Sequence, residues 1–302
     1  MVQTAHKAGD EHTSQDALIP SKENFITNAI NISSSSVVGI TVTKIDHKVI
    51  KSKSKAPFSS VKNNKFFPYT KSFEIESLGS GLIYSSNGYV ITNAHVIEGA
   101  TEIFVTLSGG EKFKGQVVGY DKLTDIALLT VDDVNLPLAV FGDSNSLIIG
   151  EWVIALGNPL GLFDLSYEPT ATIGIISGLN VDFGLKESGH VYRDMIQTDA
   201  SINEGNSGGP LINIHGEIIG INTFIMTGSD INLGSIGIGF SIPINLVEDI
   251  IKDLQLYGKV NRNYYTGLKV KPMTKKVKKY LNVPFNTGAV VIDVEKNQLI
   301  VS

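Results

Sequence analysis

Three side chains of complementary chemistry follow one another along the chain, in the order His95, Asp125 and Ser207. Ser207 lies in the glycine-dense run Gly205-Asn206-Ser207-Gly208-Gly209-Pro210, whose backbone N–H groups can point at a reacting carbonyl. A serine hydroxyl is a weak nucleophile near neutral pH. It needs an imidazole to accept its proton and a carboxylate to hold that imidazole in the right tautomer. The three residues therefore predict acyl transfer, with the N–H groups of Gly205 and Ser207 forming an oxyanion hole.

Asp125 is the least certain of the three on residue type alone, because Asp121, Asp143, Asp182, Asp194 and Asp199 compete with it. The run Thr124-Asp125-Ile126-Ala127-Leu128-Leu129 favours Asp125, since a carboxylate just before a buried strand can be held beneath an imidazole. Asp199 is instead expected to brace the loop that leads to the nucleophile.

The serine motif also fits Gly-x-Ser-x-Gly, the nucleophile elbow of α/β-hydrolases, so an esterase of that type is an alternative. Those enzymes place their histidine last. Here the only histidine after Ser207 is His215, in the expected turn of the next hairpin and too near in sequence to act as its base. The order His, Asp, Ser is that of the two-barrel proteases, and this order favours a serine peptidase.

Short β-rich runs separated by turn residues surround these motifs. They cover 37–42, 81–84, 88–92, 103–108, 114–120 and 126–131 before Ser207, and 211–214, 218–222 and 237–242 after it. Such a series predicts an all-β sandwich or barrel. One helix is expected near the end: Pro243 precedes it, Asn245 is its candidate N-cap, and Gly258 is its candidate stop. Its apolar stripe is Val247, Ile250, Ile251 and Leu254.

Composition narrows the classes of protein further. Hydrophobic residues make up 42% and charged residues 18% of the 302 residues, as in globular proteins with a substantial core. A net charge of −5 argues against a nucleic-acid partner, which requires a concentrated basic face. The absence of cysteine excludes a thiol nucleophile and cysteine-type zinc sites. The six histidines show no metal-ligand spacing, so neither a metal nor a cofactor is expected.

Two segments carry no chemical motif. Residues 1–30 are expected to form a polar extension, because the first twenty contain no apolar core of a signal peptide. Residues 45–73 are rich in Lys, Ser and Asn and are expected to form a long loop. No apolar run is long enough to span a bilayer.

Several runs in fixed order resemble the HtrA/Deg family of trypsin-like serine proteases over about residues 75–258. They are Gly88-Tyr89-Val90-Ile91-Thr92-Asn93-Ala94-His95-Val96, Thr124-Asp125-Ile126-Ala127-Leu128-Leu129, Gly157-Asn158-Pro159-Leu160-Gly161-Leu162, Thr172-Ile173-Gly174-Ile175-Ile176-Ser177, Gln197-Thr198-Asp199-Ala200-Ser201-Ile202-Asn203, and the block 205–223. The resemblance implies two six-stranded antiparallel β-barrels, one about 31–145 and the other about 150–258, with the active site between them.

The resemblance also implies ATP-independent cleavage of unfolded or damaged proteins, by a trimer or a multiple of trimers, in a bacterial periplasm or cell envelope. A chaperone-like binding protein with proteolysis secondary is the main alternative. A PDZ domain is expected after the protease. Residues 262–302 resemble the first part of one, in which the run Tyr265-Thr266-Gly267-Leu268 corresponds to the loop that grips a peptide carboxylate.

The expectations for substrate contacts are broader. A trypsin-type pocket needs a carboxylate six residues before the nucleophile, where this chain has Ser201, so no strong preference for Arg or Lys is expected. Ile202, Ile221 and Ile238 are candidates to line a pocket for small aliphatic side chains, although core packing would use the same residues. The run Ile221-Asn222-Thr223 is a candidate to pair with an extended substrate through main-chain hydrogen bonds.

Overall fold

The computed structural model describes residues 23–51, 68–132, 135–161, 166–186, 188–225, 237–262, 266–284 and 288–294. The chain divides into two compact units, Met1–Val260 and Asn261–Ser302. This division falls between the expected protease segment, which ends near residue 258, and the expected PDZ-like segment, which begins at residue 262.

The N-terminal half of the first unit is an antiparallel seven-stranded sheet in the order β5-β4-β1-β2-β3-β7-β6. Its strands are β1 (Val37–Lys51), β2 (Pro68–Ile83), β3 (Tyr89–Thr92), β4 (Ala100–Thr106), β5 (Lys112–Lys114), β6 (Gln116–Asp121) and β7 (Ile126–Thr130). The edge strands β5 and β6 are separated only by Gly115, so the sheet curves until its edges adjoin. Pairing among the described residues does not close this sheet as the expected six-stranded barrel.

The second half is a closed six-stranded barrel in the order β12-β15-β14-β13-β8-β9, which confirms the expectation for this part. Its strands are β8 (Trp152–Gly157), β9 (Thr170–Val181), β12 (Met195–Thr198), β13 (Pro210–Asn213), β14 (Ile218–Ile225) and β15 (Gly239–Pro243). A short hairpin, β10 (Gly184–Leu185) and β11 (Val191–Tyr192), lies between β9 and β12. Antiparallel pairing of all these strands disfavours the α/β-hydrolase alternative, whose sheet is mostly parallel.

Alternation of apolar and polar residues produces the buried faces of these strands. Ile103 and Val105 of β4 are buried, whereas Phe104 between them is partly exposed. Strand β7 is buried along residues 126–129. Strand patterning therefore predicted β-structure at β1, β2, β3, β4, β6 and β7 and at β13, β14 and β15, but it marked no run for β8, β9 and β12.

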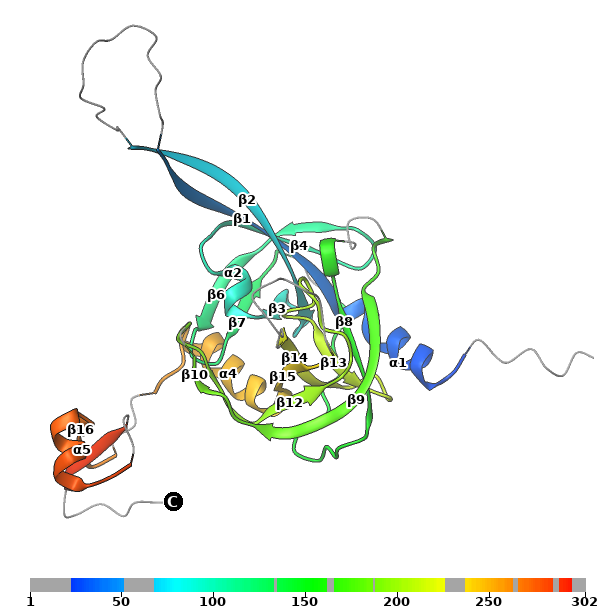
Figure 1. Cartoon of the computed structure of the whole chain (residues 1–302). Helices are drawn as coiled ribbons and strands as arrows, with labels where there is room; N and C mark the ends of the chain where they lie inside the picture. The colour runs from blue at the N-terminus through cyan, green and yellow to red at the C-terminus, as the bar shows by residue number, and fades with distance from the viewer. Residues whose placement is uncertain are drawn as a thin grey trace, which may run out of the picture. The chain divides into compact units, whose positions relative to one another are not determined.

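The strands β1 and β2 form a long ribbon that projects from the rest of the unit (Figure 1). They pair from Val37 opposite Leu82 to Lys51 opposite Pro68. The loop expected over residues 45–73 is thus shorter, because 45–51 and 68–73 are strand. The remainder of that loop lies outside the described residues.

Two helices flank the barrel. Helix α1 (Phe25–Ser33) begins inside the segment expected to be a polar extension, with Asn24 and Thr27 forming a reciprocal capping box. A 3₁₀ turn, η2 (Ser34–Ser36), follows it. The Ser33 hydroxyl donates to the Gly216 carbonyl at 2.6 Å, which attaches the helix to the β13–β14 turn.

Helix α4 (Ile244–Tyr257) buries the expected apolar stripe and ends at Gly258, which has a left-handed φ of 68°. The expected N-cap was wrong. Pro243 occupies that position, and Asn245 lies in the first turn, where its Oδ1 accepts from the backbone N–H of Ser144 at 3.0 Å. Among the helices in the described part of the chain, none is long and apolar enough to cross a bilayer.

The second unit has a strand–helix–strand order. It contains β16 (Leu268–Pro272), α5 (Lys275–Leu281) and β17 (Ala289–Val294), and the two strands pair antiparallel. Tyr265 of the expected carboxylate loop lies outside the described residues.

Candidate active site

His95 is presented where β3 ends and the short helix α2 (Ala94–Ile97) begins. The residue before this helix, Asn93, is fully buried, and its side-chain Nδ2 donates to the Asp125 carbonyl at 2.9 Å. The Ala94 N–H donates to the same carbonyl at 3.1 Å. The histidine motif therefore also holds the backbone of the aspartate.

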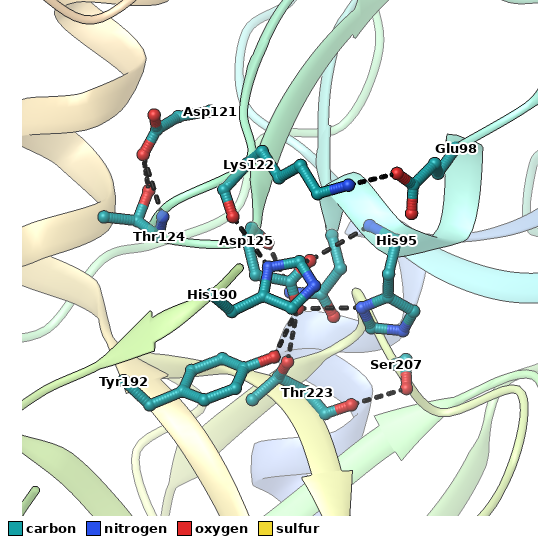
Figure 2. A network of polar contacts seen from close by, with 11 residues as sticks. His95, Glu98, Asp121, Lys122, Thr124, Asp125, His190, Tyr192, Ser207 and Thr223 are labelled. Carbon is teal, nitrogen blue, oxygen red and sulfur yellow. Dashed lines mark hydrogen bonds and ion pairs between the residues drawn. The ribbon is translucent and has the colours of Figure 1, made fainter. Parts of the chain in front are cut away.

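Asp125 lies in the turn between β6 and β7 with a positive φ of 62°, a conformation that non-glycine residues rarely adopt. Its side chain is fully buried and accepts four hydrogen bonds (Figure 2). The donors are His95 Nδ1 at 2.8 Å, the His95 backbone N–H at 3.0 Å, Thr223 Oγ1 at 2.8 Å and the Tyr192 hydroxyl at 3.2 Å. Because a carboxylate oxygen accepts, His95 carries a hydrogen on Nδ1, and its Nε2 is the nitrogen available as a base.

The surroundings of Asp125 favour its charged form. Burial would raise the pKa of the carboxyl, but the hydrogen bonds and electrostatic interaction with His95, together with the Thr223 hydroxyl, outweigh it and hold this pKa below its ordinary value. Burial and the neighbouring Asp125 charge both raise the pKa of the Tyr192 phenol. Tyr192 thus remains a protonated donor to the carboxylate.

Ser207 follows a turn that only glycine accommodates. Gly205 has a φ of 95°, and a Cβ there would lie 2.4 Å from the Asn158 carbonyl oxygen, next to the 3₁₀ turn η3 (Pro159–Gly161). Gly208 has a φ of 86°, and its N–H donates to the Asn222 carbonyl at 2.9 Å. Within the described chain the N–H groups of Gly205 and Ser207 have no acceptor.

The Ser207 hydroxyl donates to the Thr223 carbonyl at 2.8 Å in this structure. In the view of Figure 2 the His95 ring lies between the Asp125 carboxylate and Ser207. Among the described residues, no hydrogen bond joins Ser207 Oγ to His95. Rotation of the hydroxyl away from Thr223 would be needed to engage the imidazole.

Three of the competing aspartates accept hydrogen bonds from other backbone groups. The Asp121 carboxylate accepts from the Thr124 N–H at 2.9 Å, and that of Asp182 accepts from the Asp194 N–H at the same distance. Asp199 Oδ1 accepts from the Ile175 N–H at 2.7 Å, which ties the start of the loop before Ser207 to β9.

Comparison with known proteins agrees with this arrangement. Residues 79–221 match the family described as "Trypsin-like peptidase domain". The chain is 43% identical over 222 residues to a protein of Halomonas elongata, and 42% identical over 220 residues to one of Chlamydia trachomatis serovar D. Both are named DegP-like periplasmic serine endoproteases. These matches span 74% and 72% of this chain but 44% and 41% of the relatives, so the chain spans less than half of their length.

Solved structures extend the similarity to the fold. The HtrA-type protease AlgW, solved with a decapeptide, superimposes with a TM-score of 0.66 at 35% identity, over 91% of this chain and 80% of that one. The same protease with a tripeptide gives a TM-score of 0.65 at 34% identity, over 91% and 77%. The chain belongs to the HtrA family of trypsin-like serine proteases.

The three isoleucines expected to line a substrate pocket of this HtrA chain differ in exposure. Ile202 and Ile221 are 1% and 0% exposed and lie in the core, where Ile202 packs over Gly239. This burial favours the core-packing alternative for these two residues. Ile238 is partly exposed.

The segment expected to pair with an extended substrate, residues 221–223, has backbone groups that are already hydrogen-bonded within the protein. Both backbone groups of Asn222 are occupied, its N–H by the Gly209 carbonyl at 2.8 Å and its carbonyl by the Gly208 N–H. Asn222 is fully buried. In this segment, Thr223 contacts the candidate catalytic residues. Its hydroxyl donates to Asp125, and its carbonyl accepts from the Ser207 hydroxyl.

Sequence reasoning missed Ser80 of β2, a fully buried residue that connects the sheet to the nucleophile loop. Its N–H donates to the Ser207 carbonyl at 2.8 Å, and its hydroxyl donates to the Gly205 carbonyl at 2.6 Å. The same hydroxyl accepts from the Asn158 N–H at 2.8 Å. The only signal in the sequence was the pair of glycines on either side of it.

Proposed function

We propose that this HtrA family member is a serine endopeptidase that cleaves unfolded or damaged proteins. The observation that carries the proposal is the double hydrogen bond between His95 and Asp125, at 2.8 Å to the ring and 3.0 Å to the backbone. It fixes the imidazole with Nδ1 protonated, so that Nε2 is free to accept the Ser207 proton.

The proposed reaction proceeds in two acyl-transfer steps. The Ser207 hydroxyl rotates from the Thr223 carbonyl toward His95, loses its proton to Nε2 and attacks the peptide carbonyl. The Gly205 and Ser207 N–H groups donate to the oxyanion that forms. His95 then protonates the leaving amine, which departs and leaves an ester on Ser207. Water attacks that ester with His95 again as the base, and Ser207 is regenerated as the acid product leaves.

The site supports limited proposals about specificity. Ser201 stands where a pocket for Arg or Lys would need a carboxylate, so we expect a preference for other side chains, with Ile238 as a lining residue. The Thr223 carbonyl accepts the Ser207 hydroxyl at 2.8 Å, and an extended substrate N–H could take that acceptor once the hydroxyl turns away.

The proposal is tested with Ser207→Ala on casein, an unfolded protein. Loss of such a nucleophile typically lowers kcat by about 10⁶-fold. A variant that cleaves casein near the wild-type rate would remove Ser207 from the mechanism. Suppression of aggregation by the same inactive variant measures the chaperone-like alternative separately. Hydrolysis of a short acyl ester without casein cleavage would indicate an esterase.

We also propose a homo-oligomer, a trimer or a multiple of trimers, in a bacterial periplasm or cell envelope. An exposed aromatic pair supports assembly: Phe25 of α1 is 47% exposed and Trp152 of β8 is 51% exposed, with ring centroids 6.4 Å apart. The names of the relatives support the compartment. Two finer structural assignments are likewise proposals, namely closure of the N-terminal sheet as a barrel and a partial PDZ-like fold for residues 262–302.

A further inference from the structure

Three consecutive residues beside the candidate site contact the turn that carries Asp125, although the sequence marked none of them. They are His190, which precedes β11, and Val191 and Tyr192, which form it. The contacts run from His190 Nδ1 to the Lys122 carbonyl at 2.6 Å, from the Val191 N–H to the Leu123 carbonyl at 2.7 Å, and from the Tyr192 hydroxyl to Asp125 Oδ2 at 3.2 Å.

His190 is a buried histidine that the proposed reaction does not use. It is 6% exposed, its ring packs at 5.6 Å against that of Tyr192, and its Nδ1 lies 4.0 Å from Asp125 Oδ1 (Figure 2). A carbonyl oxygen accepts hydrogen bonds, so the short contact with Lys122 requires a hydrogen on His190 Nδ1. The His190 backbone is itself held, since its carbonyl accepts from the Lys186 N–H at 2.8 Å.

The turn that receives these contacts needs external support. Asp125 has a φ of 62°, and such a conformation persists only where the surrounding structure over-determines it. Asn93 and Ala94 hold its carbonyl on the side of α2. Residues 190–192 add hydrogen bonds from the opposite side, and the Thr223 hydroxyl of β14 also donates to the carboxylate.

We propose that His190 is a positioning residue for Asp125. Its Nδ1–H holds the Lys122 carbonyl and, with Val191 and Tyr192, fixes the turn so that the Asp125 carboxylate meets His95. The β10–β11 hairpin thereby acts on the carboxylate that orients the base. This inference rests on the proposed peptidase mechanism.

A different role must be separated from this one. His190 also lines, with His95, Tyr120 and Lys122, a pocket of about 380 Å³. A side chain that contacts substrate there would chiefly change KM, whereas one that positions Asp125 would chiefly change kcat.

The test compares two substitutions with the same branching and number of side-chain heavy atoms, His190→Asn and His190→Leu, in the full chain. The Asn amide retains a donor close to the Nδ1 position, and Leu does not. We expect His190→Leu to lower kcat on casein about tenfold with KM unchanged, and His190→Asn to stay within about threefold of wild type. His190→Phe, which keeps a ring beside Tyr192, is expected to behave like His190→Leu and serves if that variant fails to fold.

Equal kcat values for the Asn and Leu variants, or a change confined to KM, would overturn the proposal. A second readout does not depend on cleavage: the proton resonance of the His95 Nδ1–H bonded to Asp125, recorded by NMR in a Ser207→Ala background. We expect it to move or broaden in His190→Leu and to persist in His190→Asn. An unchanged resonance in both His190 variants would contradict the positioning role, whatever the wild-type enzyme does to casein. Casein cleavage by Ser207→Ala would instead contradict the proposed peptidase function and leave the positioning role to the NMR result.

Discussion

Thr223 contributes to the candidate site through two different groups. Its hydroxyl donates to Asp125 Oδ2 at 2.8 Å, and its carbonyl accepts from the Ser207 hydroxyl at 2.8 Å. The residue is 2% exposed, so neither group is satisfied by bulk water. Thr223 therefore couples the carboxylate to the nucleophile within one residue.

Thr223→Val tests this coupling, because valine keeps the shape and the carbonyl but lacks the hydroxyl. A hydrogen bond to a charged group is worth about 1.5–3 kcal/mol, so we expect kcat to fall about tenfold or more while Asp125 retains His95 and Tyr192. Steady-state hydrolysis of casein measures the effect. Thr223→Ser restores the hydroxyl and should stay near the wild-type rate. A fully active Val variant would show that the bond does not matter for the reaction.

The ionisation of Asp125 links the site to stability. Its pKa is below the ordinary value of about 3.9 in the folded protein. The charged carboxylate therefore stabilises the fold at pH values above the unfolded pKa, and this contribution disappears as the pH falls through the lower folded pKa. We expect Asp125→Asn to lose less unfolding free energy than wild type between about pH 6 and pH 3.

Urea unfolding at each pH measures this difference. Asp132→Asn, which removes an exposed carboxylate, is the matched control and should follow the wild-type pH dependence. A wild-type slope in Asp125→Asn would mean that the carboxylate gains nothing from its charge in the fold.

At the scale of elements, β2 and the nucleophile loop are joined through Ser80. Its N–H and hydroxyl donate to the carbonyls of Ser207 and Gly205, at 2.8 and 2.6 Å. The Thr92 hydroxyl donates to its carbonyl at 2.8 Å, which extends the connection to β3. The strand thus fixes the backbone from which both proposed oxyanion donors project.

Ser80→Ala should weaken this connection. Leaving the buried Gly205 carbonyl and Asn158 N–H without the hydroxyl costs about 1–3 kcal/mol, and we expect a lower Tm together with a reduced kcat. Thermal unfolding and casein hydrolysis measure the two effects. Ser77→Ala on the same strand is the control. An unchanged kcat in a destabilised Ser80→Ala variant would limit this residue to a role in folding.

The contrast between Ser207 and Ser80 explains what the sequence could reveal. Ser207, His95 and Asp125 stand in local motifs, so residue type and spacing identified them. Ser80 donates to Gly205, 125 positions away, and the two glycines beside it do not indicate which distant residue it contacts. Ile202 and Ile221 are the opposite case, because the sequence proposed them as pocket residues and the structure buries them. An isoleucine that packs in the core and one that lines a pocket cannot be told apart in sequence. Strand patterning predicted an all-β sandwich or barrel, and the family resemblance added the six-stranded barrel. The capping box of α1 was overlooked within a polar segment.

At the scale of the whole first unit, the site exists only where two sheets meet. His95 and Asp125 come from the N-terminal sheet, and Ser207 and Thr223 from the barrel. Helix α4 contacts β6 and β7 of the first and β14 and β15 of the second. Its buried stripe therefore ties together the two halves that carry the catalytic candidates.

The exposed apolar surface around α1 and β8 bears on assembly. Ile173 of β9 is 42% exposed, and its neighbour Ile175 lies opposite Trp152 in the barrel register. Exposed apolar patches of this kind mark protein–protein contacts more often than chance. Because the Phe25 ring also lies against that of Trp152, helix α1 and the barrel wall share this apolar surface, which supports the proposed homo-oligomer.

Trp152→Glu places a charge in this surface and should shift the protein toward the monomer, because an unpaired charge is costly to bury between subunits. Size-exclusion chromatography with light scattering measures the change in mass. Leu256→Glu, at a 71% exposed position of α4, is the control and should leave the mass unchanged. An oligomer that withstands Trp152→Glu but dissociates with Leu256→Glu would place the interface on α4 instead. Casein hydrolysis by the Trp152→Glu monomer would then reveal whether one copy suffices for cleavage, since all the candidate catalytic residues come from a single chain.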